Sequence, residues 1–258
     1  MTKKTEKKYQ DYSMISLFIR SFIFSTYSII SMIIYSFVCL ISLIFPLHFR
    51  HTLIRYYMHV YFYVLKGVCH IDYKIEGLEN IPKGRNGIIM CKHASTWETF
   101  LLPQYFHSPA PIAKRELAWI PFFGWGLLVS DPIFINRADK RSAMQQVIEK
   151  GSKCLKQGRW IMVFPEGTRI PFGETGHYKI GGARLAAETG YPVLPIAHNA
   201  GWFWPRRKFI KKPGTITMVI GPLIETKGRK PEEILKLAKD WIETTMTRIN
   251  GLVDKSPR

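Results

Sequence analysis

The amino-acid sequence predicts an α/β fold: a mixed, largely parallel sheet flanked by helices, preceded by an N-terminal helical membrane anchor. Two observations carry this prediction. From about residue 70 onward, short apolar runs alternate with segments of helical periodicity, which is the pattern of an α/β domain. Residues 21–47 contain no charged side chain, and 19 of these 27 positions are apolar. A bilayer-crossing helix needs roughly 20 such residues, so this block is long enough to span a membrane.

Seven apolar runs after residue 70 predict the strands of the sheet. They cover residues 71–76, 87–91, 111–113, 132–136, 160–164, 192–197 and 215–220. Between them, apolar residues recur at helical spacing over 143–155 and over 234–249. The second helix follows Pro231, a residue that is favoured in the first helical turn. We expect residues 69–258 to form one catalytic domain.

The N-terminal region divides into a tail and two helices. Residues 1–11 form a polar, basic tail, and residues 12–68 are expected to form the anchor. On a helical wheel, Arg20 and the serines at 21, 25, 28, 31, 36 and 42 fall within about 160°. A single helix surrounded by lipid needs no such stripe, whereas a helix packed on another helix does. Residues 47–68 mix aromatic and basic side chains, an interfacial composition. This favours a hairpin that returns to the same side of the membrane over a single crossing.

The charge balance bounds the class of partner. The chain has 37 Lys and Arg against 19 Asp and Glu, a formal charge of +18. Nucleic acid, anionic lipid and an acidic protein each fit such a charge. No nucleic-acid-binding motif accompanies it, so an anionic membrane surface is favoured, with a generally basic, solvated surface as the alternative. The four cysteines show neither zinc-site spacing nor a disulfide framework, which suits free thiols in a reducing compartment.

A histidine–carboxylate pair follows the second predicted strand. His93 and Glu98 lie about 140° apart on a straight helix, so they meet only if His93 is in the preceding turn. Ser95 is a good helix N-cap, which allows that geometry. The same residues also match a capping box, in which Glu98 only accepts the Ser95 N–H. Local pattern leaves both roles open: orienting a catalytic histidine, or capping a helix.

A second polar motif, Phe164-Pro165-Glu166-Gly167-Thr168-Arg169, follows the fifth predicted strand. Glycine allows close backbone approach to a ligand, and arginine offers a planar fork for phosphate. The alternative is a surface turn with an Arg–Glu ion pair. His93, Arg137 and Glu166–Arg169 each follow a strand. If those strands are parallel, the three groups converge in one crevice.

Taken together, in this order and spacing, the motifs resemble the glycerolipid acyltransferase family, and specifically its bacterial 1-acyl-sn-glycerol-3-phosphate (lysophosphatidate) acyltransferases. The resemblance covers most of residues 70–225 and includes four motifs in order. Beyond the two above, residues 113–125 look like the segment after the family's first motif. Phe134–Arg137 resembles its second motif and Val193–Ile196 its fourth. One position departs from the pattern, because Glu98 stands where the family usually has Asp.

The resemblance implies transfer of an acyl group from an acyl thioester to the sn-2 hydroxyl of 1-acyl-glycerol-3-phosphate, giving phosphatidic acid in phospholipid biosynthesis. His93 is then the general base and Glu98 its orienting acid. The implied substrate-binding residues are Lys114, Arg137, Glu166, Gly167, Thr168 and Arg169. No metal or cofactor is expected. The partners are membrane lipids, lysophosphatidate, and acyl-CoA or acyl carrier protein, with no nucleic acid. The expected location is the bacterial inner membrane, with the catalytic domain on its cytoplasmic face.

Other functions remain compatible with the sequence. One is an acyltransferase with a different acceptor, such as glycerol 3-phosphate or a lyso-aminolipid. Another is a non-catalytic, membrane-bound protein that binds anionic lipid, for which charge and anchor suffice. A lipid hydrolase lacks a recognisable nucleophile, because no strand–GxSxG–helix elbow surrounds Ser95.

Overall fold

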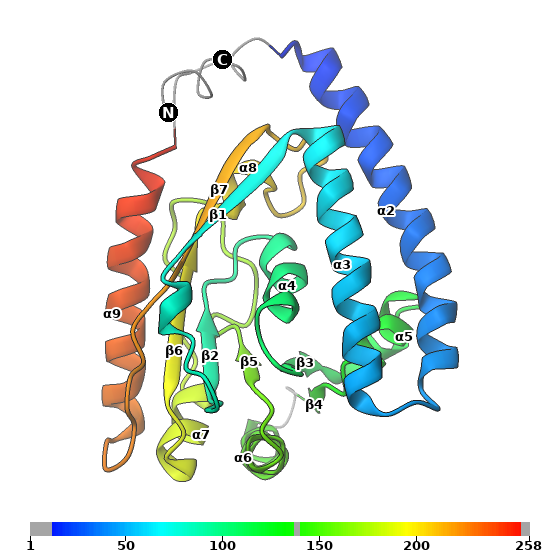
Figure 1. The fold of residues 1–258 in the computed structure, drawn as a ribbon. Coiled ribbons are helices and arrows are strands. Elements are labelled where there is room, and N and C mark those ends of the chain that lie inside the picture. The colour runs from blue at the N-terminus through cyan, green and yellow to red at the C-terminus, as the bar shows by residue number, and fades with distance from the viewer. Residues whose placement is uncertain (1–11, 137–139, 254–258) are drawn as a thin grey trace.

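The computed structural model describes residues 12–136 and 140–253. Its centre is one sheet with the strand order β1-β7-β6-β2-β5-β3-β4 (Figure 1). Neighbouring strands are parallel except β6 and β7, which are antiparallel. The strands are β1 (Ile71–Glu76), β2 (Ile88–Cys91), β3 (Ala110–Lys114), β4 (Ile133–Ile135), β5 (Ile161–Val163), β6 (Val193–His198) and β7 (Gly214–Ile220). All seven predicted strands are confirmed, with ends within one residue of the prediction.

Side-chain alternation along the strands gives the sheet two buried faces. In β2, Ile89 and Cys91 pack on the face shared with the N-terminal helices, while Ile88 and Met90 pack on the opposite face. All four are fully buried. Successive side chains of a strand point to opposite faces, so a run that is apolar throughout requires helices on both sides. The sheet therefore forms the middle of three layers.

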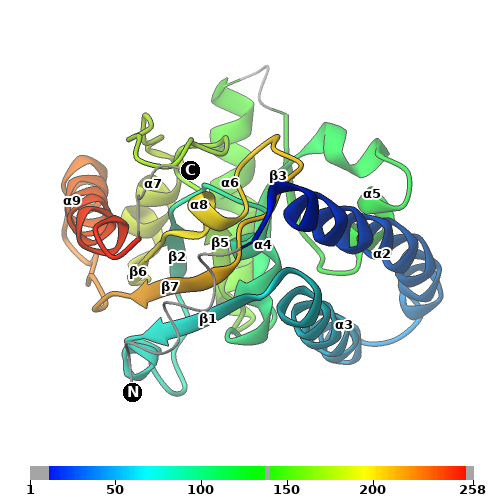
Figure 2. The same cartoon turned by 90° about the horizontal axis from the view of Figure 1, so that it is seen from above.

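Three of the helices that follow β4 cover one face of the sheet (Figure 2). They are α6 (Lys140–Lys156), α7 (Gly181–Thr189) and α9 (Pro231–Asn250), and α6 and α9 confirm the two helices predicted from periodicity. Gly182 lets α7 lie close to the strands, since a Cβ there would come within 3.0 Å of the Met90 side chain. Three short helices, α4 (Trp97–Leu101), α5 (Phe123–Leu128) and α8 (Ala200–Phe203), complete the domain.

The other face carries an antiparallel hairpin of α2 (Met14–Ser42) and α3 (Leu47–Cys69) (Figures 1 and 2). The serine stripe of α2 faces inward. Ser28 and Ser31 lie 3.0 and 3.1 Å from the hydroxyls of Tyr61 and Tyr57 on α3. Ser21 accepts a hydrogen bond from the backbone N–H of Lys211 at 2.9 Å. The stripe thus holds α2 against α3 and the domain, as a packed hairpin requires.

The outward face of α2 is apolar. Side chains that are at least half exposed recur along it, namely Ile15, Phe18, Ile19, Phe22, Ile23, Ile29, Ile30, Ile34, Phe37 and Ile41. Within the described ranges, α2 alone is long and apolar enough to cross a membrane, with a mean hydropathy of 1.9. An exposed apolar stripe of this length marks an interaction with lipid or another apolar surface. The helix is therefore a candidate membrane anchor.

α3 belongs to the core of the domain as well as to the hairpin. Ile54, Tyr61, Phe62 and Leu65 are buried in the same hydrophobic cluster as the sheet residues Ile89 and Leu194, among others. Truncating one large buried side chain costs about 2–5 kcal/mol. The whole free energy of unfolding of a domain is only about 5–15 kcal/mol. The four α3 side chains together therefore contribute a free energy about as large as the entire stability of a domain.

We accordingly predict that a chain lacking residues 1–68 does not fold cooperatively, because its sheet loses one covering layer. Deletion of residues 1–11 is the matched control and should leave thermal unfolding in detergent unchanged. Near-UV circular dichroism during heating measures both. A sharp transition of the 69–258 fragment near the full-length Tm would show that the catalytic domain is independent of the hairpin.

Candidate active site

The parallel strands β2, β5 and β3 bring their carboxyl ends to one edge of the sheet. His93 follows β2, the turn of Glu166 to Arg169 follows β5, and Lys114 ends β3. The convergence expected from the sequence is therefore confirmed for His93 and the turn of Glu166 to Arg169, and Lys114 lies at the same edge. Arg137, the third group of that expectation, lies outside the described residues.

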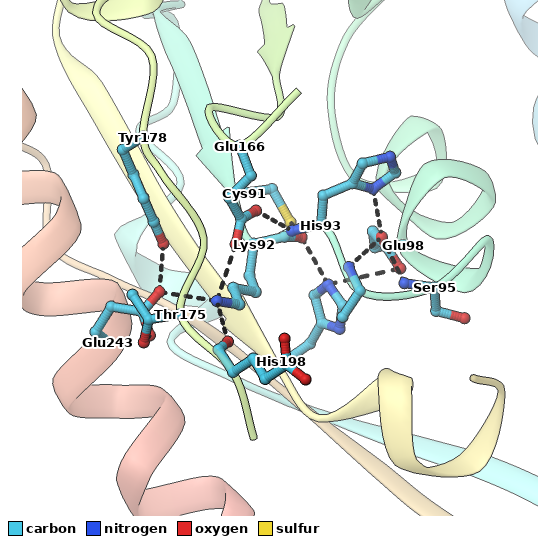
Figure 3. A network of polar contacts seen from close by, with 12 residues as sticks. Cys91, Lys92, His93, Ser95, Glu98, Glu166, Thr175, Tyr178, His198 and Glu243 are labelled. Atoms are coloured by element: carbon cyan, nitrogen blue, oxygen red, sulfur yellow. Dashed lines mark hydrogen bonds and ion pairs between the residues drawn. The ribbon is translucent and has the colours of Figure 1, made fainter. Parts of the chain in front are cut away.

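His93 and Glu98 meet in the geometry that the spacing required. His93 lies in the turn before α4, and its Nδ1 is 2.8 Å from Glu98 Oε1 (Figure 3). The same oxygen accepts the backbone N–H groups of Ala94 at 3.1 Å and Ser95 at 3.0 Å. The two roles left open by the sequence are thus performed by one oxygen atom: Glu98 fixes the start of α4 and orients the histidine.

Because a carboxylate accepts at Nδ1, the His93 ring carries its proton on Nδ1 when neutral, and Nε2 keeps a lone pair. The ring stacks on Phe164, with centroids 4.2 Å apart and planes inclined by 22°. Its side chain is 17% exposed, whereas that of Glu98 is fully buried. Nε2 has no hydrogen-bond partner in the described part of the chain. The basic nitrogen is therefore available to a substrate proton.

Glu98 is held in its charged form by its surroundings. Burial by itself favours the neutral acid, but His198, His93 and the Ser95 N–H outweigh it and lower the pKa of Glu98. His198 Nε2 lies 3.6 Å from Glu98 Oε2 and 2.9 Å from the Lys92 carbonyl oxygen. Burial lowers the pKa of His198, so this ring is neutral. The Ala200 N–H donates to His198 Nδ1 at 3.3 Å, so the ring carries its proton on Nε2 and donates it to the Lys92 carbonyl oxygen.

A second buried carboxylate, Glu166, supports His93 from its other side (Figure 3). Glu166 Oε2 accepts the His93 backbone N–H at 2.8 Å, and Oε1 lies 2.8 Å from Lys92 Nζ. Lys92 is 1% exposed and also contacts Glu243 Oε1 of α9 at 2.9 Å. Burial raises the pKa of Glu166, and the Lys92 ammonium opposes that shift. Glu166 therefore positions the histidine segment and the turn after β5.

Glu243 is itself held by hydroxyl groups. Tyr178 donates to its Oε1 at 2.7 Å and Thr175 to its Oε2 at 2.8 Å. Glu243 thus accepts from Lys92, directly after β2, and from Tyr178 and Thr175, which lie in the segment between β5 and α7. Buried charges of this kind persist only when they are paired and hydrogen-bonded. The network joins β2, the turn after β5 and α9 in one rigid unit.

The turn after β5 places a cationic group beside the histidine. Gly167 has φ of 67°, a left-handed conformation that glycine adopts without strain. Its N–H donates to the Phe164 carbonyl at 2.9 Å, so this N–H closes the turn. Arg169 donates from Nη1 to the Thr96 hydroxyl at 2.7 Å. Arg206 donates to the Arg169 carbonyl oxygen at 2.7 Å, which brings a second guanidinium to the turn. Thr168 and Lys114 are exposed.

An apolar cavity of about 380 Å³ opens next to this site. Thr96 and Arg169 are among its lining residues. From there it runs between the helical hairpin, α4, α5 and strands β3 and β5. Its walls include Ile29, Met32, Ile54, Tyr57, Met58, Phe100, Pro111, Phe123, Leu127 and Met162. A concave, mostly apolar cavity with few polar groups is the usual form of a binding site for an apolar ligand.

Sequence reasoning missed four polar residues of the site: Lys92, His198, Arg206 and Glu243. A charged residue at the end of a buried strand was a signal for Lys92, because such a position requires a partner. His198 ends β6, one residue beyond the predicted strand. Arg206 and Glu243 look like ordinary surface positions in the sequence. In the described ranges, no group of three or more His, Cys, Asp or Glu side chains is arranged to hold a metal ion.

Comparison with known proteins agrees with this geometry. The family model for acyltransferases matches residues 72–199. A 1-acyl-sn-glycerol-3-phosphate acyltransferase of Pseudomonas aeruginosa is 46% identical over 188 residues, covering 72% of this chain and 73% of that protein. The protein of the same name from Borreliella burgdorferi is 33% identical over 173 residues, covering 65% and 69%.

Among solved structures, the 1-acyl-sn-glycerophosphate (LPA) acyltransferase PlsC of Thermotoga maritima has a similar fold. The TM-score is 0.75 at 26% sequence identity, covering 90% of this chain and 95% of that one. With its active-site motifs, its fold and these similarities, the chain belongs to the acyltransferase family that includes the 1-acyl-sn-glycerol-3-phosphate acyltransferases.

Proposed function

We propose that the protein transfers an acyl group from an acyl thioester to the sn-2 hydroxyl of 1-acyl-glycerol-3-phosphate, giving phosphatidic acid for phospholipid synthesis. The observation that carries the proposal is the His93–Glu98 pair, with an unpartnered basic nitrogen, beside the Arg169 turn and next to the apolar cavity. The similarity to relatives named for this reaction supports the choice of substrate.

The proton moves through His93. An alcohol is a weak nucleophile at neutral pH, so His93 Nε2 removes the proton of the sn-2 hydroxyl as its oxygen attacks the thioester carbonyl. Glu98 stabilises the imidazolium that forms. When the tetrahedral intermediate collapses, the carbon–sulfur bond breaks and the thiolate takes the proton back from the imidazolium. General base catalysis of this kind contributes on the order of 10²–10⁴ in rate. The scheme uses no metal or cofactor.

The cationic groups at the site fix the acceptor. Arg169 and Arg206 lie together at the turn, and the planar fork of arginine suits a phosphate monoester. Lys114 at the end of β3 adds a point charge, and Arg137 is proposed to act with them. Binding of the phosphate places the sn-2 hydroxyl beside His93, which reduces the entropic cost of reaction. Glu166, Gly167 and Thr168 shape this turn.

The apolar cavity is proposed to hold the acyl chain. The cavity begins beside the active site, where two of its lining residues lie. Thr96 is three residues after His93, and Arg169 is the proposed phosphate ligand. Burial of methylene groups contributes about 0.8 kcal/mol each, so the cavity supplies binding energy in proportion to the length of chain it accepts. The donor, acyl-CoA or acyl carrier protein, delivers that chain as a thioester.

The hairpin sets the site near a membrane. The outward apolar face of α2 is proposed to enter the cytoplasmic leaflet of the bacterial inner membrane, and both ends of the hairpin stay on the cytoplasmic side. The strong net positive charge of the chain favours an anionic lipid surface. This position gives the cavity and the phosphate site access to a lipid acceptor without extracting it into water.

The function is tested by a mass-spectrometric acyl-transfer assay with lysophosphatidate, glycerol 3-phosphate and a lyso-aminolipid, each with acyl-CoA and acyl carrier protein donors. We expect phosphatidic acid from lysophosphatidate alone. His93→Ala should abolish turnover and leave folding and membrane association intact. A wild-type protein that acylates another acceptor faster would reassign the substrate. Retention of more than a few per cent of kcat in His93→Ala would remove the base role.

Glu98→Gln separates the two functions of one oxygen atom. The amide oxygen still accepts the Ala94 and Ser95 N–H groups, so Tm at neutral pH should change little. It carries no charge to stabilise the imidazolium, so kcat should fall about 10²–10⁴-fold. Glu98→Asp keeps the charge and should keep substantial activity. Near-normal kcat in Glu98→Gln would leave Glu98 as a capping residue only.

The same variant should change the acid sensitivity of folding. Since the pKa of Glu98 is lowered in the folded protein, its carboxylate stabilises the fold above the pKa of the unfolded chain. That contribution is lost as the pH falls through the folded-state pKa. Below about pH 4.5, the usual pKa of a glutamate, Tm should therefore decrease less steeply in Glu98→Gln than in the wild type.

Arg169→Lys replaces a bidentate fork by a point charge. We expect KM for lysophosphatidate to rise about tenfold or more, since hydrogen bonds to charged groups are worth about 1.5–3 kcal/mol. Monoacylglycerol, which lacks the phosphate, is the control acceptor and should be affected much less. Equal loss with both acceptors would mean that Arg169 acts through its Thr96 contact, as part of the loop structure.

A further inference from the structure

The apolar cavity has polar groups in its wall that an alkyl chain does not need. Most of its polar lining side chains are paired: Ser28 with Tyr61, Tyr57 with Ser31, and Thr96 with Arg169. His51 of α3 is different. It is 5% exposed and lines the cavity, yet neither ring nitrogen has a hydrogen-bond partner in the structure. Buried polar groups are normally satisfied, so an unpaired imidazole facing a binding cavity calls for an explanation.

His51 lies at the end of the cavity that is remote from the catalytic histidine. Electrostatic interactions link it to His107, Asp131 and Arg159. Two cavity residues lie close to these in the chain: Pro109 is two residues after His107, and Ser130 precedes Asp131. Pro109 precedes β3, at the amino edge of the sheet, whereas Thr96 and Arg169 lie at the carboxyl edge. The cavity therefore extends from the active site along the sheet to His51.

Helix geometry gives the depth of this position. Tyr61 contacts Phe100 of α4 near the active-site end of the cavity, with ring centroids 5.4 Å apart. His51 precedes Tyr61 by ten residues on the same helix, a distance of about 15 Å along its axis. An extended chain advances about 3.5 Å for every three bonds, so His51 lies roughly a dozen bonds deeper than Tyr61. It meets the distal half of a long acyl chain.

The chemistry at this point suits a neutral hydrogen-bonding group. Burial, with the neighbouring Arg159, lowers the pKa of His51 to about 4, so the ring offers one N–H donor and one lone pair. The Arg159 guanidinium is already used by the carbonyl oxygens of Ser108 and Ser130 and by Asp131. Arg50, the neighbour of His51 on α3, also acts on the ring, but neither arginine is among the residues that line the cavity. This end of the cavity is therefore lined by neutral groups. A hydroxyl group, which both donates and accepts, matches the imidazole.

Tyr35 of α2 independently supports a site for a hydroxyl group. Its hydroxyl also lies in the cavity lining and is buried without a hydrogen-bond partner, apart from an interaction with the weakly polar Cys39 thiol. The ring stacks on Tyr57, with centroids 3.9 Å apart, which fixes its direction. Tyr57 lies between His51 and Tyr61 on α3, so the two unpaired groups follow one another along the cavity wall.

We propose that His51, together with Tyr35, forms a subsite that binds a hydroxyl group on the distal half of an acyl chain. The subsite makes the enzyme select hydroxylated acyl chains over plain chains of the same length. This proposal rests on the proposed function, since it assumes that the cavity holds an acyl chain of the transfer reaction. The selectivity arises because a plain chain leaves the imidazole unpaired, whereas a hydroxyl group satisfies it.

The test compares palmitoyl thioesters with and without one hydroxyl, placed in turn at each carbon from 10 to 16, with lysophosphatidate as acceptor. The measured quantity is the ratio of kcat/KM for the hydroxylated chain to that for plain palmitate. In the wild type this ratio should exceed one at one or two adjacent positions. His51→Leu should lower it about tenfold at those positions and use plain palmitate at least as well.

Three further variants make the outcome specific. His51→Asn retains a donor and an acceptor and should keep most of the preference, whereas Tyr35→Phe should reduce it in part. Met58→Leu changes an apolar lining residue and should leave the ratio unchanged. Tm in detergent should not decrease in His51→Leu, because the substitution removes an unpaired polar group. If this variant fails to fold, the wild-type ratio together with His51→Asn and Tyr35→Phe still tests the hydroxyl subsite.

Two results would overturn the proposal: a ratio below one at every position in the wild type, or the same ratio in the wild type and in His51→Leu. Transfer of plain palmitate to lysophosphatidate tests the proposed function separately. If that transfer occurs while the hydroxyl preference is missing, the hydroxyl subsite is wrong and the acyltransferase function stands.

Discussion

The geometry of the active site depends on one carboxylate oxygen, Glu98 Oε1, which accepts hydrogen bonds from the His93 ring and from the Ala94 and Ser95 backbone. The turn after β2 cannot shift without breaking two of these bonds, and the ring cannot rotate without breaking the third. Since Glu98 is fully buried, water cannot replace the lost partners. The same hydrogen bonds therefore fix both the position of the proposed base and the beginning of α4.

A second carboxylate fixes the same segment from the sheet side. Glu166 holds the His93 N–H and Lys92, and Lys92 reaches Glu243 of α9, 151 residues further along the chain. Removing one member of such a buried network leaves an uncompensated charge and typically lowers the free energy of unfolding by about 3–5 kcal/mol. The arrangement couples the catalytic turn to the C-terminal helix. Glu166 and the Gly167 N–H are occupied within the protein, so the anion binding that we propose at the turn falls to Arg169 and Arg206.

The sequence was sufficient where the determining interactions are local. Strands showed as short apolar runs, and a five-residue spacing with a helix start allowed the pairing of His93 with Glu98 while leaving a capping role open. It was insufficient where partners are distant in the chain. Glu243 resembles a solvent-exposed helix position until α9 packs beside β6, and His198 is one more residue of an apolar strand. The cavity is formed by the packing of α2 and α3 on α4 and α5, so its polar wall groups, His51 and Tyr35, carried no local signal. Arg137 lies outside the described residues, and its predicted role stays a prediction.

The proposed mechanism requires Glu98 to hold His93 with a free lone pair on Nε2. Nitrogen-15 NMR of protein labelled at histidine measures this directly, with the His93 signals assigned by their loss in His93→Gln. We expect a neutral wild-type ring that is protonated at Nδ1 and unprotonated at Nε2. In Glu98→Gln, the balance between the two tautomers should shift. A neutral His93 ring protonated at Nε2 in the wild type would contradict the mechanism, because that nitrogen then has no lone pair to receive the proton of the acceptor hydroxyl.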